Sequence, residues 1–471
     1  MENKFSKYLK KKKPLLKELL DKLLEQYEYV SILATDVFGK LYTVNRSSTS
    51  VGDGRSAECG FVIKVYDKGM YFEYATNKID RKDIDKIIEE VGKLVNNKTT
   101  NKQIQIGVIN EEEITKSFVR KNVGKKYQTE EIISLLQELV NENLRAEKVI
   151  NVNVMVSVQE VSKLFLSKNK DLEQYYNYSN GGAMVLVGEG SNMKYAYDGV
   201  DTNSLAYVMK KMPKKIVEVR KLAIELLNAE LIKPGVYTIV TDPSITGLIA
   251  HEAFGHGVEM DQFVKDRAIA QEYINKPVAS KLVNMHDGAA AFNSVASYFF
   301  DDDGVLAQDT LIIENGILKR GISDVTSALQ LGTKPTGNGR RQAFNHKSYS
   351  RMTNTFFEAG ESTLKELIKS VDYGYYISQT SNGMEDPKNW GIQCSAHVGR
   401  EIKNGKFTGK IVSPVVMSGY VIDLLMSISG ISKDMVISGS GQCGKGYKEW
   451  VRVSDGGPCL KAEVKIGWLS N

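Results

Sequence analysis

Hydrophobic positions in the first half of the chain follow two different periods. Apolar residues recur at helical spacing over 16–27, 80–95 and 129–144, as expected for helices with one buried face. Short apolar or alternating runs over 29–35, 61–66 and 70–75 are typical of strands, and 152–158 alternates valine strictly at period two. The turn Asp67-Lys68-Gly69 joins two of these strands as a hairpin. The first half is therefore predicted to be α+β, with an antiparallel sheet.

The first predicted helix follows a run of four lysines, residues 10–13. Pro14 comes next, and proline is tolerated in the first turn of a helix. We therefore interpret the basic run as the solvated start of that helix, because a single run of four lysines is a weak signal for a membrane or a nucleic acid.

A change of pattern near residue 230 divides the chain. A helical stretch over 212–230 closes the first half, and Pro234-Gly235 then restarts the chain into a strand over 236–241. Beyond it, short strands are bounded by glycine, with hairpin turns at Glu314-Asn315-Gly316 and Lys403-Asn404-Gly405. We predict an α+β domain over 1–229, contributing a substrate cavity or a dimer contact, and a β-rich domain over 230–471.

Length, composition and charge exclude several classes of protein. The 471 residues favour two domains, and 42% hydrophobic with 25% charged residues is ordinary for a globular protein. The net charge of +5 is small, so we expect no nucleic-acid partner. No apolar stretch approaches the roughly 20 residues that span a bilayer, and the N-terminus has no signal-type apolar core. A cytoplasmic location without membrane association is expected, and the four cysteines are predicted to be free thiols or metal ligands.

Two of the five histidines flank a glutamate in the segment His251-Glu252-Ala253-Phe254-Gly255-His256. Asp242 and Pro243 upstream predict the start of a helix that carries this segment. Metal-binding histidines on a regular helix lie four residues apart, where they are rotated by roughly 40°, whereas a spacing of five rotates them by roughly 140°. The two imidazoles can therefore converge only if the helix is widened by a π-type bulge, or if it ends near Gly255, since glycine tolerates unusual backbone angles.

A catalytic zinc ion normally has three protein ligands, so a third one is needed. Glu259 or Asp261 lies just downstream, Cys394 and His397 form a Cys-x-x-His spacing, and Cys443 lies between glycines that would allow close approach. Spacing alone leaves these three alternatives open.

Four segments of the second half together resemble the TldD/PmbA family of peptidases. The histidine segment is similar to the HExxxH signature of that family, and the other three match in order and approximate distance. The four segments are 251–261 (HEAFGHGVEMD), 336–341 (TGNGRR), 351–355 (RMTNT) and 442–445 (QCGK). In the first half the likeness lies in the layout of strands and helices more than in any motif.

The resemblance implies a two-domain fold with a zinc ion held by His251, His256 and Cys443, and hydrolysis of unfolded or modified small peptides. The family also contains PmbA-type chains that lack the histidine motif and pair with a TldD-type chain. Because this chain has the motif, the resemblance implies the catalytic, metal-bearing type, acting as a homodimer or as a heterodimer with a PmbA-type subunit.

Glu252 is the predicted general base and acid. Zinc with three protein ligands lowers the pKa of its bound water to about 7 and polarises a carbonyl. Glu252 would take the proton of the water and return it to the leaving amine. A peptide substrate would pair its backbone with an exposed strand edge, which is indifferent to side-chain sequence.

Other polar residues have two interpretations each. Asn338, Arg340 and Arg341 are candidate substrate-binding residues, since arginine presents a fixed fork of donors, or they brace their loop against the acidic run 301–303. We interpret the remaining cysteines as structural, and leave the remaining histidines unassigned: Cys59, Cys394, Cys459, His286, His346 and His397. The alternative function is a peptide-binding scaffold with a structural zinc site, which would need a fourth ligand such as Glu259 or Asp261.

Overall fold

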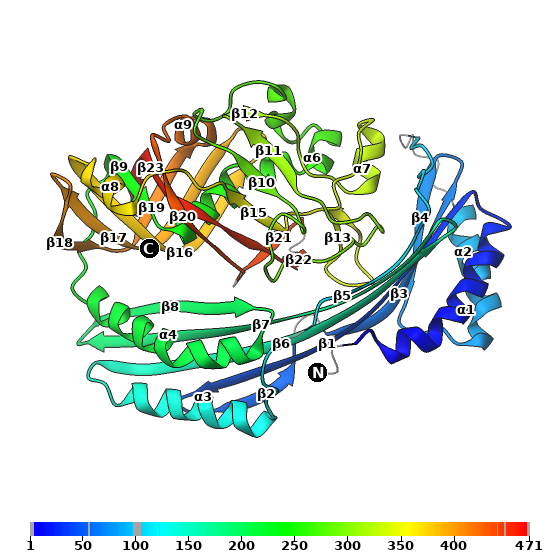
Figure 1. Ribbon diagram of the computed structural model, residues 1–471, viewed down its shortest axis with the longest axis horizontal. Helices are drawn as coiled ribbons and strands as arrows, with labels where there is room; N and C mark the ends of the chain where they lie inside the picture. The colour runs from blue at the N-terminus through cyan, green and yellow to red at the C-terminus, as the bar shows by residue number, and fades with distance from the viewer. Residues whose placement is uncertain are drawn as a thin grey trace.

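The computed structural model describes residues 4–54, 57–97, 105–121, 123–439, 441–446 and 449–468. Its first half is an eight-stranded sheet in the order β4-β3-β1-β6-β7-β5, with β2 added beside β1 and β8 beside β7. Long strands give this sheet most of the length of the molecule (Figure 1). The strands are β1 (Tyr29–Asn45), β2 (Thr49–Asp53), β3 (Glu58–Asp67), β4 (Met70–Thr76), β5 (Ile114–Val119), β6 (Val149–Ser167), β7 (Lys170–Glu189) and β8 (Asn192–Thr202).

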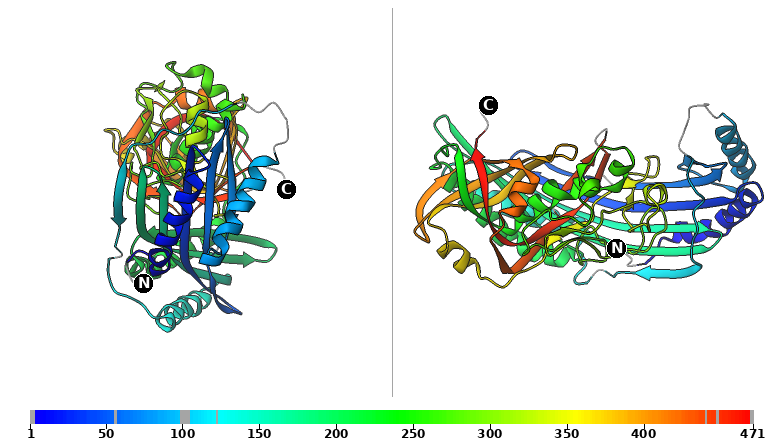
Figure 2. Two further views of the ribbon diagram at one scale, coloured as in Figure 1. Left: turned by 90° about the vertical axis from the view of Figure 1, so that its right-hand side faces the viewer. Right: turned by 90° about the horizontal axis from the view of Figure 1, so that it is seen from above.

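Four helices cover one face of this sheet and the C-terminal half covers the other. The helices are α1 (Lys7–Leu24), α2 (Ile84–Asn96, preceded by the short η1 at Arg81–Asp83), α3 (Thr129–Leu144) and α4 (Leu205–Leu226). Helices α1 and α2 lie at the end of the molecule remote from the C-terminus, and α3 and α4 lie under the other end (Figures 1 and 2).

Side-chain alternation explains the two covered faces. The valines at 152, 154, 156 and 158 are all buried against α3 and α4, as the period-two pattern predicts. In β1, Ile32 points to the helices, whereas its neighbour Leu33 joins Phe165 and Phe300 in a cluster with the C-terminal half. Gln174 also donates a hydrogen bond to the Phe300 carbonyl at 2.9 Å. Both faces of the sheet are therefore buried, and the C-terminal half lies directly on one of them.

The second half is built on an eleven-stranded sheet that closes partly on itself. Strands β9, β16, β17, β19 and β23 form a ring, because β23 pairs with both β19 and β9. From β23 the sheet continues through β15, β10, β11 and β12. Its strands are β9 (Gly235–Thr241), β10 (Met285–Asp287), β11 (Thr310–Glu314), β12 (Ile317–Leu318), β15 (Asn354–Phe357), β16 (Tyr373–Asp386), β17 (Gly391–Lys403), β18 (Lys406–Val412), β19 (Val415–Tyr420), β20 (Gly430–Ser438) and β23 (Ser454–Gly467).

Short elements complete this half. Two small hairpins lie outside the large sheet, β13 (Gly339–Arg340) with β14 (Tyr349–Ser350), and β21 (Gln442–Lys445) with β22 (Glu449–Arg452). The helical segments are α5 (Pro243–Leu248), η2 (Ile249–Gly255), η3 (His256–Val258), α6 (Met260–Val264), η4 (Ile269–Tyr273), α7 (Val325–Gln330), α8 (Leu364–Lys369) and α9 (Val421–Met426).

The predicted α+β class with a β-rich second half is confirmed, and so are the hairpin turns. Lys68, Asn315 and Asn404 have positive φ angles and each is followed by a glycine with positive φ, as two-residue hairpin turns require. The predicted domain boundary after residue 229 falls between α4, the last element packed on the first sheet, and β9, the first strand of the second.

Two predicted helix starts are wrong. Helix α1 begins at Lys7, after the N-cap Ser6, so the lysine run and Pro14 lie inside it. Helix α4 begins at Leu205 and contains Pro213. In both cases apolar residues before the proline are buried, Leu9 in α1 and Val208 in α4, and this burial extends the helix past a residue that normally disfavours a helix interior.

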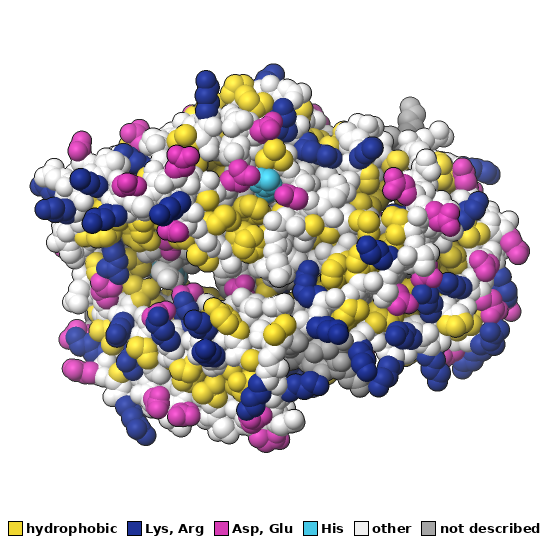
Figure 3. All heavy atoms as spheres, in the orientation of Figure 1, with side chains coloured by type: hydrophobic (Ala, Val, Ile, Leu, Met, Phe, Trp, Pro, Cys, Tyr) yellow, Lys and Arg dark blue, Asp and Glu magenta, His cyan; other side chains and the backbone are white. Residues whose placement is uncertain are grey.

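Helix composition and the distribution of surface charge concern a possible membrane or nucleic-acid partner. None of the helices in the described ranges is long and apolar enough to cross a membrane. On the face shown in Figure 3, lysine and arginine side chains are interspersed with aspartate and glutamate.

Candidate metal centre

A π-helix brings the two motif histidines to one side of the chain. Helix α5 begins at the N-cap Asp242, whose carboxylate accepts a hydrogen bond from the Ile245 amide, with Pro243 in the first turn. The backbone then widens into η2, and the amide of His256 donates to the carbonyl of His251, five residues back. This is the widening that the spacing of five requires. The imidazole rings lie edge to face with centroids 5.0 Å apart.

Gly255 serves this turn for a different reason than the sequence suggests. Its φ angle is −63°, which any residue adopts in a helix. A Cβ atom at this position would lie 2.1 Å from the Met352 sulfur. Glycine is therefore required for space against a fully buried methionine rather than for backbone freedom.

Cys443, on β21, completes a cluster of three donors with the histidines. The ligand atoms of the three residues all lie within 4.8 Å of one another, and the Cys443 Sγ is 3.4 Å from the His256 Nε2. Zinc bonds of about 2.3 Å to sulfur and about 2.0–2.1 Å to nitrogen place two tetrahedral ligands about 3.6 Å apart. The spacing therefore fits a metal ion of this kind.

Burial and charge also fit a cation at this position. His251 is only 4% exposed, and its Nδ1 has no hydrogen-bond partner among the described residues, with the nearest carboxylate oxygen, of Asp455, 3.9 Å away. Burial by itself would raise the pKa of the Cys443 thiol, but the charged imidazoles of His256 and His251 outweigh burial and hold that pKa well below its ordinary value. A buried thiolate beside an unsatisfied imidazole nitrogen is a donor set that suits zinc.

One of the histidines is oriented by a carboxylate. The Nδ1 of His256 lies 3.1 Å from an oxygen of Glu259, which leaves its Nε2 directed at Cys443. Such a carboxylate fixes the tautomer and the ring plane of a metal-binding histidine.

Glu252 and Glu385 face the donor cluster from the same cleft. The cleft has a volume of about 480 Å³ and is bordered by the π-helix, the end of β16 and the β21–β22 hairpin. Glu252 is half-buried there, one residue after His251. Glu385 accepts a hydrogen bond from the Gly257 amide at 3.0 Å, and burial raises its pKa well above the ordinary range, with a further contribution from the Glu252 charge. The arrangement offers one carboxylate to accept a proton beside three metal donors.

Several known proteins resemble this chain in sequence. The family described as PmbA/TldA metallopeptidase C-terminal domain matches residues 234–464. A metalloprotease of Methanocaldococcus jannaschii is 26% identical over 459 residues, which cover 95% of this chain and 99% of that protein. A zinc metalloprotease TldD homolog of Saccharolobus solfataricus is 32% identical over 61% of this chain and 62% of its own length. Residues 234–464 of the chain therefore belong to the PmbA/TldA metallopeptidase C-terminal domain family.

Other relatives match over a smaller part. The chain spans about half of a Buchnera aphidicola metalloprotease TldD homolog, with 35% identity over 250 residues. Solved structures match nearly the whole chain. The crystal structure of TldE from Thermococcus kodakarensis superposes with a TM-score of 0.74 over 96% of this chain and 100% of that one, at 17% identity. A candidate modulator of DNA gyrase from Bacteroides thetaiotaomicron reaches a TM-score of 0.76 at 18% identity, with 98% and 99% of the two chains covered. These structural likenesses show the shared fold.

The other candidates for a third ligand are bound to or packed against other groups. Both carboxylates downstream of the motif are bound by Lys445, whose Nζ lies 2.9 Å from Glu259 and 2.7 Å from Asp261. Cys394 and His397 lie on β17 three positions apart, and this odd spacing directs them to opposite faces of the strand. His397 packs against Tyr195 instead.

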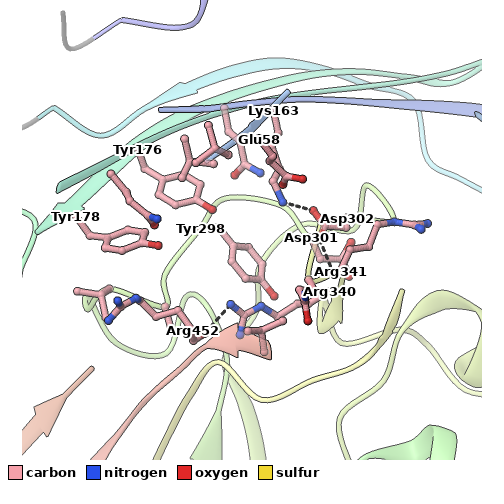
Figure 4. A pocket seen from close by; sticks show the side chains of 18 of the residues that line it. Glu58, Lys163, Tyr176, Tyr178, Tyr298, Asp301, Asp302, Arg340, Arg341 and Arg452 are labelled. Carbon is pink, nitrogen blue, oxygen red and sulfur yellow. Dashed lines mark hydrogen bonds and ion pairs between the residues drawn. The ribbon is translucent and has the colours of Figure 1, made fainter. Parts of the chain in front are cut away.

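The family segment 336–341 is held mainly by internal contacts. Asn338 is fully buried, and its amide donates to Asp287 at 2.7 Å and to the Arg351 carbonyl. The Arg340 guanidinium donates to the carbonyl of Met352. It also donates to the carbonyl of Arg452 (Figure 4). These are bracing contacts, and the substrate-binding role of Asn338 and Arg340 stays a prediction.

Arg341 in the same segment connects the two halves of the molecule. Its guanidinium is paired with both oxygens of Glu73 on β4 and donates to the His346 carbonyl. The acidic run braces the backbone, because Asp301 accepts from the Gly339 amide and Asp302 from the Arg341 amide, each at 2.8 Å. Arg340 and Arg341 line a polar cavity of about 90 Å³ between the first sheet and the C-terminal half (Figure 4).

The remaining cysteines and histidines have no place in the donor cluster. All four cysteines are free thiols, with Cys394 and Cys459 buried in strands β17 and β23. His286 lies between the carboxylates of Asp309 and Glu358, and His346 lies 3.2 Å from Glu449.

Sequence reasoning missed several residues of the site: Glu385, Asp455, Arg351 and Lys445. Arg351 and Lys445 lie inside the family segments 351–355 and 442–445, but these segments by themselves assign no role to either side chain. Glu385 lies in no such segment, and only the return of β16 to the π-helix places it at the cleft.

Proposed function

We propose that this chain is a zinc-dependent peptidase in which His251, His256 and Cys443 hold the metal. The observation that carries the proposal is the convergence of these three donors in a cleft that Glu252 also borders. Two relatives are named metalloproteases, one aligned over 95% of this chain and the other over 61% of it. When bound, a zinc ion supplies Lewis acidity that polarises a carbonyl and acidifies water.

The residues of the chain itself would move the proton. Glu252 takes a proton from the attacking water and delivers it to the leaving amine, which requires a carboxylate within hydrogen-bond reach of both atoms. Glu252 suits this role because it is half-buried at the cleft wall, beside His251 on the π-helix. Glu385 faces the same space with a raised pKa and would supply a neutral donor rather than a second charge.

Peptides in an extended, unfolded or modified form are the proposed substrates. The cleft is bordered by the open ends of β16 and of the β21–β22 hairpin, where a peptide backbone could pair with strand edges. The working assembly is proposed to be a homodimer or a heterodimer with a PmbA-type chain, in line with the fold shared with TldE.

The alternative function, a peptide-binding scaffold with a structural zinc site, predicts a fourth protein ligand. Glu259 and Asp261 are the two carboxylates that follow the histidine motif, and both are bound by Lys445 instead. The three-donor set therefore favours a site with an open position for water or substrate.

Metal content and peptide hydrolysis measured together test the proposal. We expect wild type to carry about one zinc ion per chain and to cleave a random-coil peptide library, whereas Cys443→Ala loses both. Glu252→Gln should keep the zinc and lose cleavage. Cys459→Ala is the matched control, because Cys459 is also a buried thiol but lies outside the donor cluster.

The outcomes separate the two functions. Zinc bound by wild type without any cleavage, even after addition of a PmbA-type chain, would favour the scaffold. Cleavage retained by Glu252→Gln would remove that residue from the mechanism. Light scattering of the purified chain, alone and with a PmbA-type chain, distinguishes homodimer from heterodimer.

A further inference from the structure

Two cations, Arg351 and Lys445, lie buried behind the proposed metal ligands. Arg351 is 0% exposed and is the largest of the fully buried side chains in the described part of the chain. The Lys445 side chain is 9% exposed. Taking a charge out of water costs several kcal/mol unless it is paired and hydrogen-bonded, so the partners of these two side chains indicate what they do.

Arg351 faces two groups that hold proposed metal ligands in place: the backbone of Cys443, and the carboxylate of Glu259, which contacts His256. One of its terminal nitrogens donates to the carbonyl of Cys443 at 2.7 Å, and the other donates to the carbonyl of Glu449 on the paired strand β22 at 3.0 Å. Its Nε faces Glu259 Oε1 at 4.0 Å, and neither atom has another partner in the described residues. A single planar guanidinium thus spans the backbone of one ligand and the carboxylate that orients the other.

Lys445 makes the second connection from the strand that carries Cys443. The two residues are two positions apart on β21 and therefore point to the same face. Its ammonium group lies 2.9 Å from Glu259 Oε2 and 2.7 Å from Asp261 Oδ1, and it donates to the Ser350 carbonyl at 2.8 Å. Glu259 Oε2 is thus shared between Lys445 and the imidazole of His256.

The β21–β22 hairpin needs such connections, because it is not part of the large sheet. In the described residues β21 pairs only with β22, so no ladder of backbone hydrogen bonds fixes the hairpin against the π-helix. Cys443 and His256 are 187 positions apart in sequence. Their spacing therefore depends on side-chain contacts between the hairpin and the segment 256–261.

We propose that Arg351 and Lys445 are positioning residues that fasten the Cys443 hairpin to Glu259, and through it set the distance and orientation between Cys443 and His256. The inference rests on the proposed function, because it concerns the same three donors. Held by two cations, Glu259 accepts a hydrogen bond from the Nδ1 of His256 and leaves the Nε2 directed toward Cys443.

Zinc affinity and a cobalt spectrum of Arg351→Lys test the inference. Lysine keeps the charge but cannot span the Cys443 carbonyl and Glu259 together. We expect zinc to bind about 10- to 100-fold more weakly in competition with a chelator. Cobalt substituted for zinc should show altered thiolate charge-transfer and ligand-field bands. Arg400→Lys is the matched control, since Arg400 is paired with both oxygens of Glu225 away from the site, and it should leave both measurements unchanged.

Unchanged zinc affinity and cobalt bands in folded Arg351→Lys would overturn the inference. If circular dichroism shows that this variant is unfolded, Lys445→Gln decides by the same two measurements. Unfolding of both variants while Arg400→Lys stays folded would show a purely structural role and also overturn it. A wild type that binds zinc without cleaving peptides contradicts only the peptidase proposal, whereas a wild type that binds no zinc contradicts both.

Discussion

Filling the space at Gly255 should disturb the site through packing alone. In Gly255→Ala the added methyl group would lie 2.1 Å from the Met352 sulfur and 3.2 Å from the Ala250 carbonyl oxygen. Non-bonded heavy atoms prefer about 3.5–4.0 Å, so the sulfur has to move by about 1.5 Å. Met352 is fully buried and cannot swing into solvent.

The expected cost follows from two opposing effects. Overpacking a core costs about 1–3 kcal/mol, whereas replacing a helical glycine by alanine gains about 1 kcal/mol. Because an approach of 2.1 Å is severe, the overpacking cost should lie in the upper part of that range, about 2–3 kcal/mol, and we expect Gly255→Ala to lose about 1–2 kcal/mol of unfolding free energy. Because His256 follows directly, zinc affinity should also fall by about tenfold, which corresponds to about 1.4 kcal/mol.

Urea unfolding of the metal-free protein and chelator competition measure these two quantities. Gly92→Ala is the matched control, because Gly92 lies in α2 with no atom within 4 Å of an added Cβ, and it should gain about 1 kcal/mol. In the Met352→Ala background, Gly255→Ala should cost little or become stabilising. The reasoning is refuted if Gly255→Ala is as stable as wild type, or if its cost is the same in both backgrounds.

Two further predictions concern charges outside the donor cluster. Burial and the neighbouring Asp303 raise the pKa of Asp324 to about 6, so its charged form destabilises the fold above pH 6 and protonation recovers up to about 3 kcal/mol as the pH falls toward 4. Asp324→Asn, which can still cap α7, should therefore be more stable than wild type at pH 7.5 in urea unfolding, and a difference that persists unchanged at pH 4 would contradict this. Breaking the buried pair between Arg341 and Glu73 with Arg341→Gln should cost about 3 kcal/mol of unfolding free energy. The KM for peptide cleavage should stay the same, whereas full stability with a raised KM would instead support the substrate-binding role predicted from sequence.

Local physics made part of the site predictable. A spacing of five between His251 and His256 excludes a regular helix as a shared metal site, and the chain indeed forms a π-helix there. The same kind of reasoning placed the hairpin turns and the long strand through Val152 to Val158. It failed at Pro14 and Pro213, because burial of residues before each proline outweighs the local preference.

The third donor could not be chosen from spacing. Cys443 was predicted from the resemblance to a known family. From residue type and spacing alone, Glu259 or the pair Cys394 and His397 suited a zinc ion equally well. What separates these candidates is tertiary contact: Lys445 binds the carboxylate of Glu259, and a strand directs Cys394 and His397 to opposite faces. Neither contact leaves a periodic signal in the sequence.

The donor cluster thus combines two histidines that are close in sequence with a cysteine that is distant in sequence. Six consecutive residues place His251 and His256, so this part of the site can form wherever the π-helix forms. Cys443 arrives on a hairpin that the large sheet does not hold, 187 positions from His256. A metal ion bound by all three donors would close that long loop, and its binding free energy would add to the stability of the hairpin. The buried cations behind the ligands set this geometry before any metal arrives, and preorganisation of this kind reduces the ordering that metal binding would otherwise require.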